Sequence, residues 1–206
     1  MNSKIYTIGY SSFERDYFAE ILAEHNIGAV IDVRSSPYSE YYSDYDRPEL
    51  EAFLISRKIY YRNYAHEFGA RQENTDYHSS EGYVDFEKFA LSQQFREGVD
   101  RLINAMRMGY VFVLMCAEKN PVNCHRAILV SRAFHDRGCE VRHILPLGEP
   151  ITQKDLEREL LEMYFSDRAQ GDLFTGYRTD DELIQEAYRL QNAKIGWRPA
   201  TNKEGQ

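Results

Sequence analysis

The sequence predicts an α/β domain with an open, mostly parallel five-stranded sheet and helices on both of its faces. Short apolar stretches alternate five times with longer amphipathic ones, and the most apolar stretch, 110–115, runs directly into polar residues. This alternation is typical of parallel strands joined by right-handed crossovers. A chain of 206 residues is short for a closed eight-stranded barrel, so a partial or distorted TIM-like barrel is the alternative.

The first half of the domain is predicted to contain three strands and two helices. Ser11 and Glu14 form the Ser-x-x-Glu pattern of a capping box, and apolar residues at helical spacing follow, which predicts a helix to about His25. Asp46 and Glu49 repeat the pattern around a proline and predict a helix to about residue 58. The predicted strands are 4–8, 29–34 and 59–64. A long irregular stretch, 65–83, follows the third strand.

The second half is predicted to complete the sheet. Asp85 caps a helix that reaches about Met108 and ends at Gly109, and Gly138 ends the next long helix. Thr152 begins a last core helix to about 165. The predicted strands are 110–115 and 140–145. We therefore expect one α/β domain over residues 1–165, and a helical extension with a frayed tail over residues 166–206, with a helix at 180–192.

Composition narrows the classes of function. The net charge of −8 does not favour non-specific binding to nucleic acid or to acidic membranes. No apolar run approaches the roughly 20 residues of a membrane span, and the residues before the first strand lead us to expect no signal peptide. Three cysteines do not make a disulfide framework, so we expect a cytoplasmic protein with free thiols. The oligomeric state stays open.

Polar residues follow three of the predicted strands. They occupy residues 9–12, 32–35 and 116–126. Ligands of parallel α/β sheets bind beyond the carboxyl ends of the strands. We therefore expect these three segments to meet at one site.

The third segment leads into a helix. Cys124, His125 and Arg126 fall in or near its first turn, where free N–H groups and the helix dipole favour an anion. Arg126 is expected to grip a phosphate or carboxylate, and His125 to act as an acid or base or to bind substrate. The alternative is that Cys124 only fills space while Arg126 pairs with Asp32 or Glu118.

Cys116 and Glu118 follow the most apolar strand. A carboxylate just beyond a buried strand suits general acid–base work, so Glu118 and His125 are the first candidates for catalysis, with Cys116 as a candidate nucleophile. Zinc favours cysteine and histidine ligands, but the Cys-x7-Cys-His spacing matches no common finger or ribbon. We therefore predict no metal and no cofactor.

The first two segments add further candidates. Asp32 and Arg34 lie two residues apart on a predicted strand, so their side chains are expected to point to the same side. Asp32 is then a candidate catalytic carboxylate and Arg34 a candidate substrate-binding cation. The alternative is a buried ion pair that fixes the conformation of the loop. Ser35 follows Arg34. The loop at Gly9, Tyr10 and Ser11 is expected to present N–H groups to a ligand. It is neither Gly-x-Gly-x-x-Gly nor a P-loop, so we predict no dinucleotide and no nucleoside triphosphate hydrolysis.

Tyrosines are concentrated near the second and third strands. They either form a stacking wall for a base or sugar or pack as an amphipathic surface under a loop. Arg62 and Arg71 would add positive charge, and Arg71 is a candidate for substrate binding. The tyrosines are at positions 38, 41, 42, 45, 60, 61 and 64.

Together these segments resemble the family of domain of unknown function 488. The resemblance runs in order from about residue 4 to 146 and is carried by Thr7-Ile8-Gly9-Tyr10-Ser11, Asp32-Val33-Arg34-Ser35-x-Pro37 and Cys116-Ala-Glu-x-x-Pro121-x-x-Cys124-His125-Arg126. The family often has His at position 10 and a Gly pair near 68–70, and this chain departs from both. The resemblance implies an α/β domain with these motifs at one site, and it supplies no reaction.

Three functions fit these features. The first is a hydrolase- or transferase-type enzyme whose anion-binding acid–base site acts on a phosphate-, sugar- or nucleobase-bearing substrate. The second is a non-catalytic module that binds a nucleotide-like ligand or nucleic acid. The third is a metal-dependent or thiol-redox protein. We prefer the first, because it accounts for the arginines, the histidine and the carboxylates together.

Overall fold

The computed structural model describes residues 4–146, 149–167 and 178–200, and it confirms an α/β fold with an open, mostly parallel sheet. The strand order is β3-β2-β4-β1-β5-β6, and only the β5–β6 pair is antiparallel. The sheet is not closed, so the barrel alternative is wrong. The strands are β1 (Lys4–Gly9), β2 (Ala29–Asp32), β3 (Tyr60–Asn63), β4 (Phe112–Cys116), β5 (Glu140–Ile144) and β6 (Ile151–Thr152).

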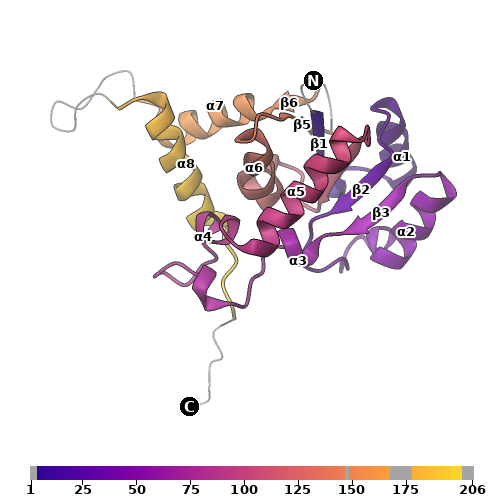
Figure 1. Ribbon diagram of the computed structural model, residues 1–206, viewed down its shortest axis with the longest axis horizontal. Helices are drawn as coiled ribbons and strands as arrows, with labels where there is room; N and C mark the ends of the chain where they lie inside the picture. Colours follow the sequence, from indigo (N-terminus) through magenta and orange to yellow (C-terminus); the bar gives the residue numbers. More distant parts are fainter. Residues whose placement is uncertain (1–3, 147–148, 168–177, 201–206) are drawn as a thin grey trace, which may run out of the picture.

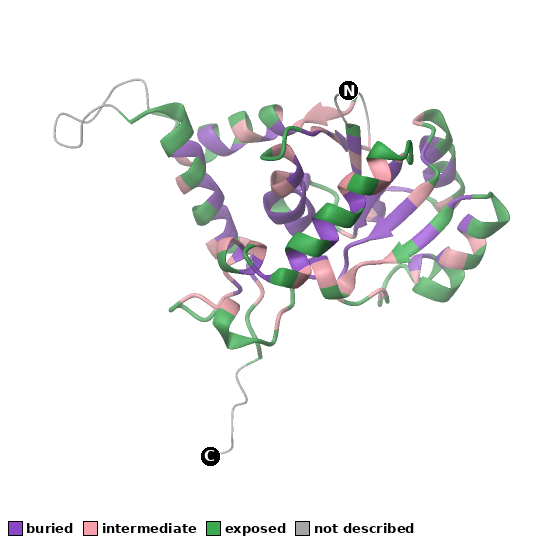
Figure 2. Cartoon of the chain, viewed as in Figure 1, coloured by how far each residue is buried: buried purple, intermediate pink, exposed green. Residues whose placement is uncertain are grey.

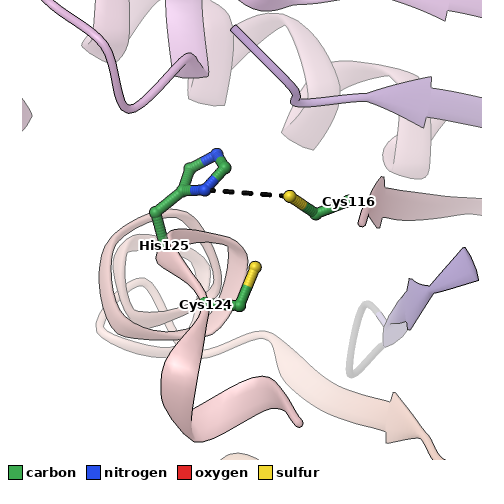
Figure 3. Close-up of side chains that lie close together, drawn as sticks. All are labelled: Cys116, Cys124 and His125. Atoms are coloured by element: carbon green, nitrogen blue, oxygen red, sulfur yellow. Dashed lines mark hydrogen bonds between the residues drawn. The ribbon is translucent and has the colours of Figure 1, made fainter. Parts of the chain in front are cut away.

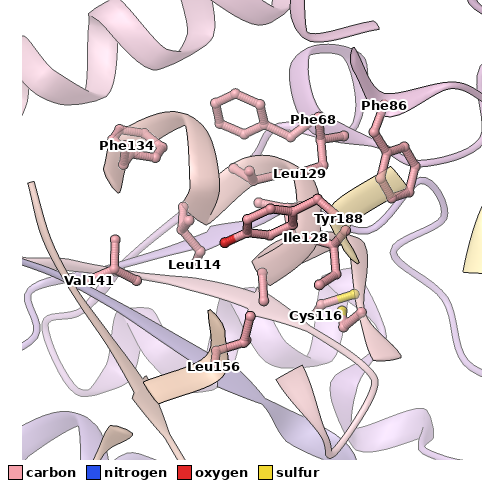
Figure 4. Packing of buried hydrophobic residues seen from close by; sticks show 14 of the residues in the cluster. Phe68, Phe86, Leu114, Cys116, Ile128, Leu129, Phe134, Val141, Leu156 and Tyr188 are labelled. Carbon is pink, nitrogen blue, oxygen red and sulfur yellow. The ribbon is translucent and has the colours of Figure 1, made fainter. Parts of the chain in front are cut away.

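Helices cover both faces of the sheet (Figure 1). Two of them lie on one face and belong to a core with Phe18, Leu22 and Leu50. The others lie on the opposite face and build a larger core around Leu114 and Phe134 (Figure 4). The first two are α1 (Arg15–Glu24) and α2 (Arg47–Ser56); the others are α3 (Ala65–Phe68), α4 (Phe86–Ala90), α5 (Gln93–Arg107), η5 (Arg126–Ser131), α6 (Arg132–His135), α7 (Gln153–Tyr164) and α8 (Asp180–Ile195).

β4 is the central strand, as its apolar sequence predicts. All five of its residues are buried, and it lies between β1 and β2. Figure 2 shows the contrast between these buried strands and the exposed outer sides of the helices. A strand that is covered on both faces needs apolar side chains on both sides, which explains the unbroken apolar run.

Several predicted elements differ in detail. The helix expected over 86–108 is two helices, because the hydroxyl of Ser92 accepts a hydrogen bond from the N–H of Phe95 and caps α5. The capping box expected at Ser11 is wrong: Ser11 lies in a short 3-10 turn, and α1 begins after Glu14 without a side-chain cap. Asp46 does precede α2, but its carboxylate accepts from the N–H of Ser39.

Three further differences concern connecting segments. The stretch 65–83 holds the one-turn helix α3 and a 3-10 turn at Thr75–Tyr77. The helix expected to run to residue 137 begins with a π-helical segment, η5, before α6. β6 is a sixth strand of two residues beside β5, too short to leave a periodic signal.

The C-terminal segment contributes to the main core. Leu183, Ala187 and Tyr188 of α8 are buried in the larger cluster, and Gln153 of α7 donates a hydrogen bond to the Tyr188 hydroxyl. The helix expected at 180–192 therefore exists and extends to Ile195. The rest of the expected extension falls partly at 168–177 and 201–206, outside the described residues. Within the described ranges, no helix is long and apolar enough to cross a membrane.

Candidate active site

The three polar segments leave the sheet at the same edge. In the strand register, Gly9 lies beside Cys116, and Asp32 lies beside Met115. β1 and β2 lead into helices on one face of the sheet, whereas β4 leads into η5 on the other. The edge around β4 is therefore a switch point, where the chain leaves neighbouring strands in opposite directions and where α/β sheets bind ligands.

Two thiols and an imidazole meet just beyond β4 (Figure 3). Cys116 ends the strand, while Cys124 and His125 come from the start of the following helix, and the three side chains point into the same space. Their sulfur and nitrogen atoms lie within 4.8 Å of one another, and Sγ of Cys116 is 3.8 Å from Nδ1 of His125. All three residues are buried.

Glu118 joins this cluster from the solvent side. Its Oε2 atom lies 2.9 Å from Sγ of Cys116 and 2.9 Å from Sγ of Cys124, although the residue as a whole is exposed. The carboxylate thus turns inward from the surface onto the two buried thiols. Glu118 is the member of the group that both solvent and the cluster can reach.

A backbone carbonyl fixes the orientation of the His125 ring. Nε2 lies 2.9 Å from the carbonyl oxygen of Val33, just after β2. A carbonyl only accepts, so Nε2 carries the proton in the neutral ring, and the lone pair of Nδ1 faces Cys116. No sequence signal predicts this contact, because the two residues are far apart in the chain.

Arg126 holds the loop that carries Glu118. Its guanidinium group is completely buried and donates from Nη1 to the carbonyl oxygen of Glu118, at 2.5 Å, and from Nη2 to that of Lys119, at 3.3 Å. Its Nε atom has no partner among the described residues. Gly9 makes room for this arrangement, since a Cβ there would lie 1.9 Å from the carbonyl oxygen of Glu118.

Asp32 and Arg34 form a separate buried pair. Nε and Nη2 of Arg34 donate to the two carboxylate oxygens of Asp32, the shortest contact being 2.6 Å, and the Tyr61 hydroxyl donates to Asp32 as well. Nη2 of Arg34 also donates to the carbonyl oxygen of Tyr45. These contacts match the structural alternative for the pair, a lock on the loop after β2. Among the described atoms, Nη1 of Arg34 has no partner.

The remaining predicted site residues lie around this edge. Tyr10 is buried and stacked on Tyr45, with ring centroids 4.4 Å apart, and the guanidinium of Arg34 lies 5.0 Å above its ring. Ser11 donates its N–H to the carbonyl oxygen of Ala117. Ser35 accepts from the N–H of Arg71, whose residue is exposed and whose side chain makes no site contact that the structure describes.

The predicted tyrosine wall divides into two groups. Tyr45 and Tyr61 are buried, whereas Tyr38, Tyr41, Tyr42 and Tyr60 are exposed. A hollow of about 400 Å³ lies between residues 11–15 and 41–45. Because Ser11 is bonded to the residue before Glu118, this hollow adjoins the loop that carries the carboxylate.

The cluster shifts the pKa values of its members in different directions. Burial raises the pKa of the Cys124 thiol, but the hydrogen bond with Cys116, the charge of Arg126 and the contact with His125 outweigh it and lower the pKa well below its usual value. The hydrogen bond with Cys124 and burial raise the pKa of Cys116. Burial and the charge of Cys124 raise the pKa of Glu118. The cluster therefore favours one thiolate, at Cys124, beside a protonated neighbour.

The fold and this edge define an α/β protein with a cluster of two cysteines, a histidine and a glutamate, a candidate site, at the switch point of its sheet. A model of the family described as "Domain of unknown function DUF488" matches residues 14–133, more than half of the chain. The chain belongs to this family. The match contains the second and third motifs and ends just beyond the π-helix. No match was found among curated proteins or among solved structures.

Proposed function

We propose that the protein is a cytoplasmic enzyme of hydrolase or transferase type, in which Glu118 transfers a proton to or from a substrate bound at the β4 edge. The position of Glu118 carries the proposal. It is an exposed residue two positions beyond the end of the central strand, and one carboxylate oxygen lies 2.9 Å from each of two buried thiols. A group that acts as a general acid or base must be able to reach the substrate, and its pKa must be set by its neighbours. Glu118 meets the first need through its exposure and the second through its contacts with the two buried thiols.

The surroundings favour an anionic substrate. Arg126 bonds to carbonyl oxygens, and no carboxylate among the described residues forms an ion pair with it. It lies beneath the loop that carries Glu118, where its positive charge, which also acts on the Cys124 thiol, attracts a phosphate or carboxylate group. Arg34, in the loop after β2, is paired with Asp32, but its Nη1 has no partner among the described residues and could donate one further hydrogen bond to an anion.

The adjoining hollow suits the non-reacting part of such a substrate. Tyr41 and Tyr42 are exposed on one wall, and Ser11 and Ser12 lie on the other. Exposed aromatic rings stack on nucleobases and sugars, and serine hydroxyls bond to their polar groups. We therefore propose a phosphate-, sugar- or nucleobase-bearing substrate. The three free cysteines support the reducing cytoplasm as its compartment.

The proposal is tested with Glu118→Gln, which keeps the size and polarity of the side chain. Phosphate esters, glycosides and nucleosides are incubated with the wild-type protein, and products are followed by mass spectrometry. For a substrate that is turned over, Glu118→Gln is expected to lower kcat by about 100-fold or more. Glu24→Gln, at the exposed end of α1, is the matched control and should keep full activity. Equal rates for both variants would refute the role of Glu118.

A further inference from the structure

The cluster beyond β4 has the composition of a metal site. Two sulfur atoms and one imidazole nitrogen converge, all within 4.8 Å. A tetrahedral zinc ion with bonds of about 2.0–2.3 Å keeps its ligands roughly 3.3–3.8 Å apart. The 3.8 Å between Sγ of Cys116 and Nδ1 of His125 lies at the upper end of that range. The other ligand atoms lie within 4.8 Å, so small side-chain movements would bring them to the same spacing.

The imidazole is prepared to act as a ligand. In the neutral ring the Val33 carbonyl oxygen keeps the proton on Nε2, so Nδ1 presents its lone pair toward Cys116. A hydrogen bond from the second ring nitrogen to a carbonyl is the usual support of a metal-bound histidine. The backbone positions are equally fixed, because Cys116 belongs to the central strand and Arg126 bonds back across the loop.

Although the Cys-x7-Cys-His spacing predicts no metal, we infer from this geometry that Cys116, Cys124 and His125 bind a divalent metal ion of the zinc class, with the fourth position open toward Glu118. Thiolate and imidazole ligands select zinc over hard cations such as Mg²⁺ or Ca²⁺. Three protein ligands with an open fourth position are the arrangement of catalytic zinc sites, where the metal activates a water molecule. The exposed Glu118 lies on that side of the cluster.

The metal's catalytic part rests on the proposed function, whereas metal binding does not. The ion would hold a water molecule whose proton passes to Glu118. The resulting hydroxide would form a bond to the electrophilic carbon or phosphorus of the substrate, and the leaving group would depart with the proton from Glu118. This sequence makes the reaction a hydrolysis.

Metal binding is tested on the full-length chain without a histidine tag. The purified protein is reduced, equilibrated with zinc and dialysed, and its metal content is measured by mass spectrometry. We expect one zinc ion per chain. Replacement by Co²⁺ should give thiolate-to-cobalt absorption in the near ultraviolet and the strong visible bands of a tetrahedral site. The cobalt spectrum needs no variant, so it remains decisive if a substitution prevents folding.

Variants then locate the metal. Cys124→Ser and His125→Gln should each lose the zinc, while Cys139→Ser should keep it, because Cys139 is buried outside the cluster. Glu118→Gln should keep the metal but lose activity, so loss of metal and failure of the proposed acid–base role are distinguishable. The inference would be overturned if the wild-type protein bound no zinc. If Cys116 and Cys124 then formed a disulfide on mild oxidation, they would instead be a redox pair. Equal loss of zinc in Cys139→Ser would overturn it as well.

Discussion

The Nε2 atom of His125 lies 2.9 Å from the carbonyl oxygen of Val33, and this contact ties the loop after β4 to the end of β2. It turns Nδ1 toward Cys116 and thereby decides which ring nitrogen the two thiols face. The candidate site thus depends on neighbouring strands being held in register, because a shift of β2 along β4 would move the carbonyl away from the ring.

Gly9→Ala should disrupt the site without unfolding the protein. A Cβ at this position would lie 1.9 Å from the carbonyl oxygen of Glu118, which must move and take the loop with it. We expect at least a tenfold weaker affinity for zinc, measured by competition with a chromogenic chelator. Gly28→Ala is the control, because its nearest atom would be 3.8 Å away. Wild-type affinity in Gly9→Ala would contradict this prediction.

Asp32→Asn should strongly destabilise the fold. The substitution leaves the buried guanidinium of Arg34 without its carboxylate partner, and breaking a buried pair in this way costs about 3–5 kcal/mol. The free energy of unfolding is measured with urea. The exposed pair between Asp16 and Arg57 gives the comparison, since Asp16→Asn should cost less than about 1 kcal/mol. If both variants lost similar amounts of unfolding free energy, the burial of the Asp32–Arg34 pair would have little energetic consequence.

His143 should make the protein sensitive to acid. Burial lowers the pKa of this histidine to about 3, with the charge of Arg126 acting in the same direction. The ring is held neutral between the Thr7 hydroxyl and the amide oxygen of Gln153. Below about pH 6.5 this histidine is protonated in the unfolded chain but stays neutral in the folded chain. The free energy of unfolding therefore falls as the pH falls, by up to about 1.4 kcal/mol per pH unit, until the folded histidine also becomes protonated near pH 3.

The measurement for His143 is the free energy of unfolding in urea at pH 7 and at pH 5, in the wild type and in His143→Gln. The glutamine keeps polar atoms for Thr7 and Gln153 but does not titrate in this range. We expect a smaller loss of stability between the two pH values in the variant. An identical loss would assign the acid sensitivity to other groups.

Ser92→Ala should weaken the start of α5. The Ser92 hydroxyl accepts from the N–H of Phe95, and loss of such a cap costs about 0.5–2 kcal/mol. Ser56→Ala, at the exposed end of α2, should change stability by less than about 0.5 kcal/mol. Thermal unfolding of the two variants measures the difference. A Ser92 variant as stable as the wild type would mean that packing alone holds α5 in place.

The sheet could be predicted because its strands carry their own signal. β4 is apolar throughout and lies between β2 and β1, and β5 lies on the other side of β1. The alternation of strands and helices in the sequence predicts all four of these strands. The division between α4 and α5 could not be predicted in this way, since Ser92 interrupts an otherwise continuous helical pattern. β6 consists of two residues and leaves no periodicity.

The candidate site could be predicted at the level of segments but not of side chains. Parallel strands end at one edge, so Gly9, Asp32 and Cys116 were bound to lie near one another. The sequence does not reveal that Arg34 turns onto Asp32 or that Arg126 bonds to backbone carbonyls. The direction of each side chain depends on the geometry of the loops and on the π-helical segment η5.

X-ray absorption at the zinc edge of the purified, zinc-loaded protein would identify the metal ligands. We expect two sulfur ligands at about 2.3 Å, one imidazole nitrogen at about 2.0 Å and one further light atom, in tetrahedral geometry. A spectrum with only nitrogen and oxygen ligands, or with six-fold coordination, would contradict a metal held by Cys116, Cys124 and His125.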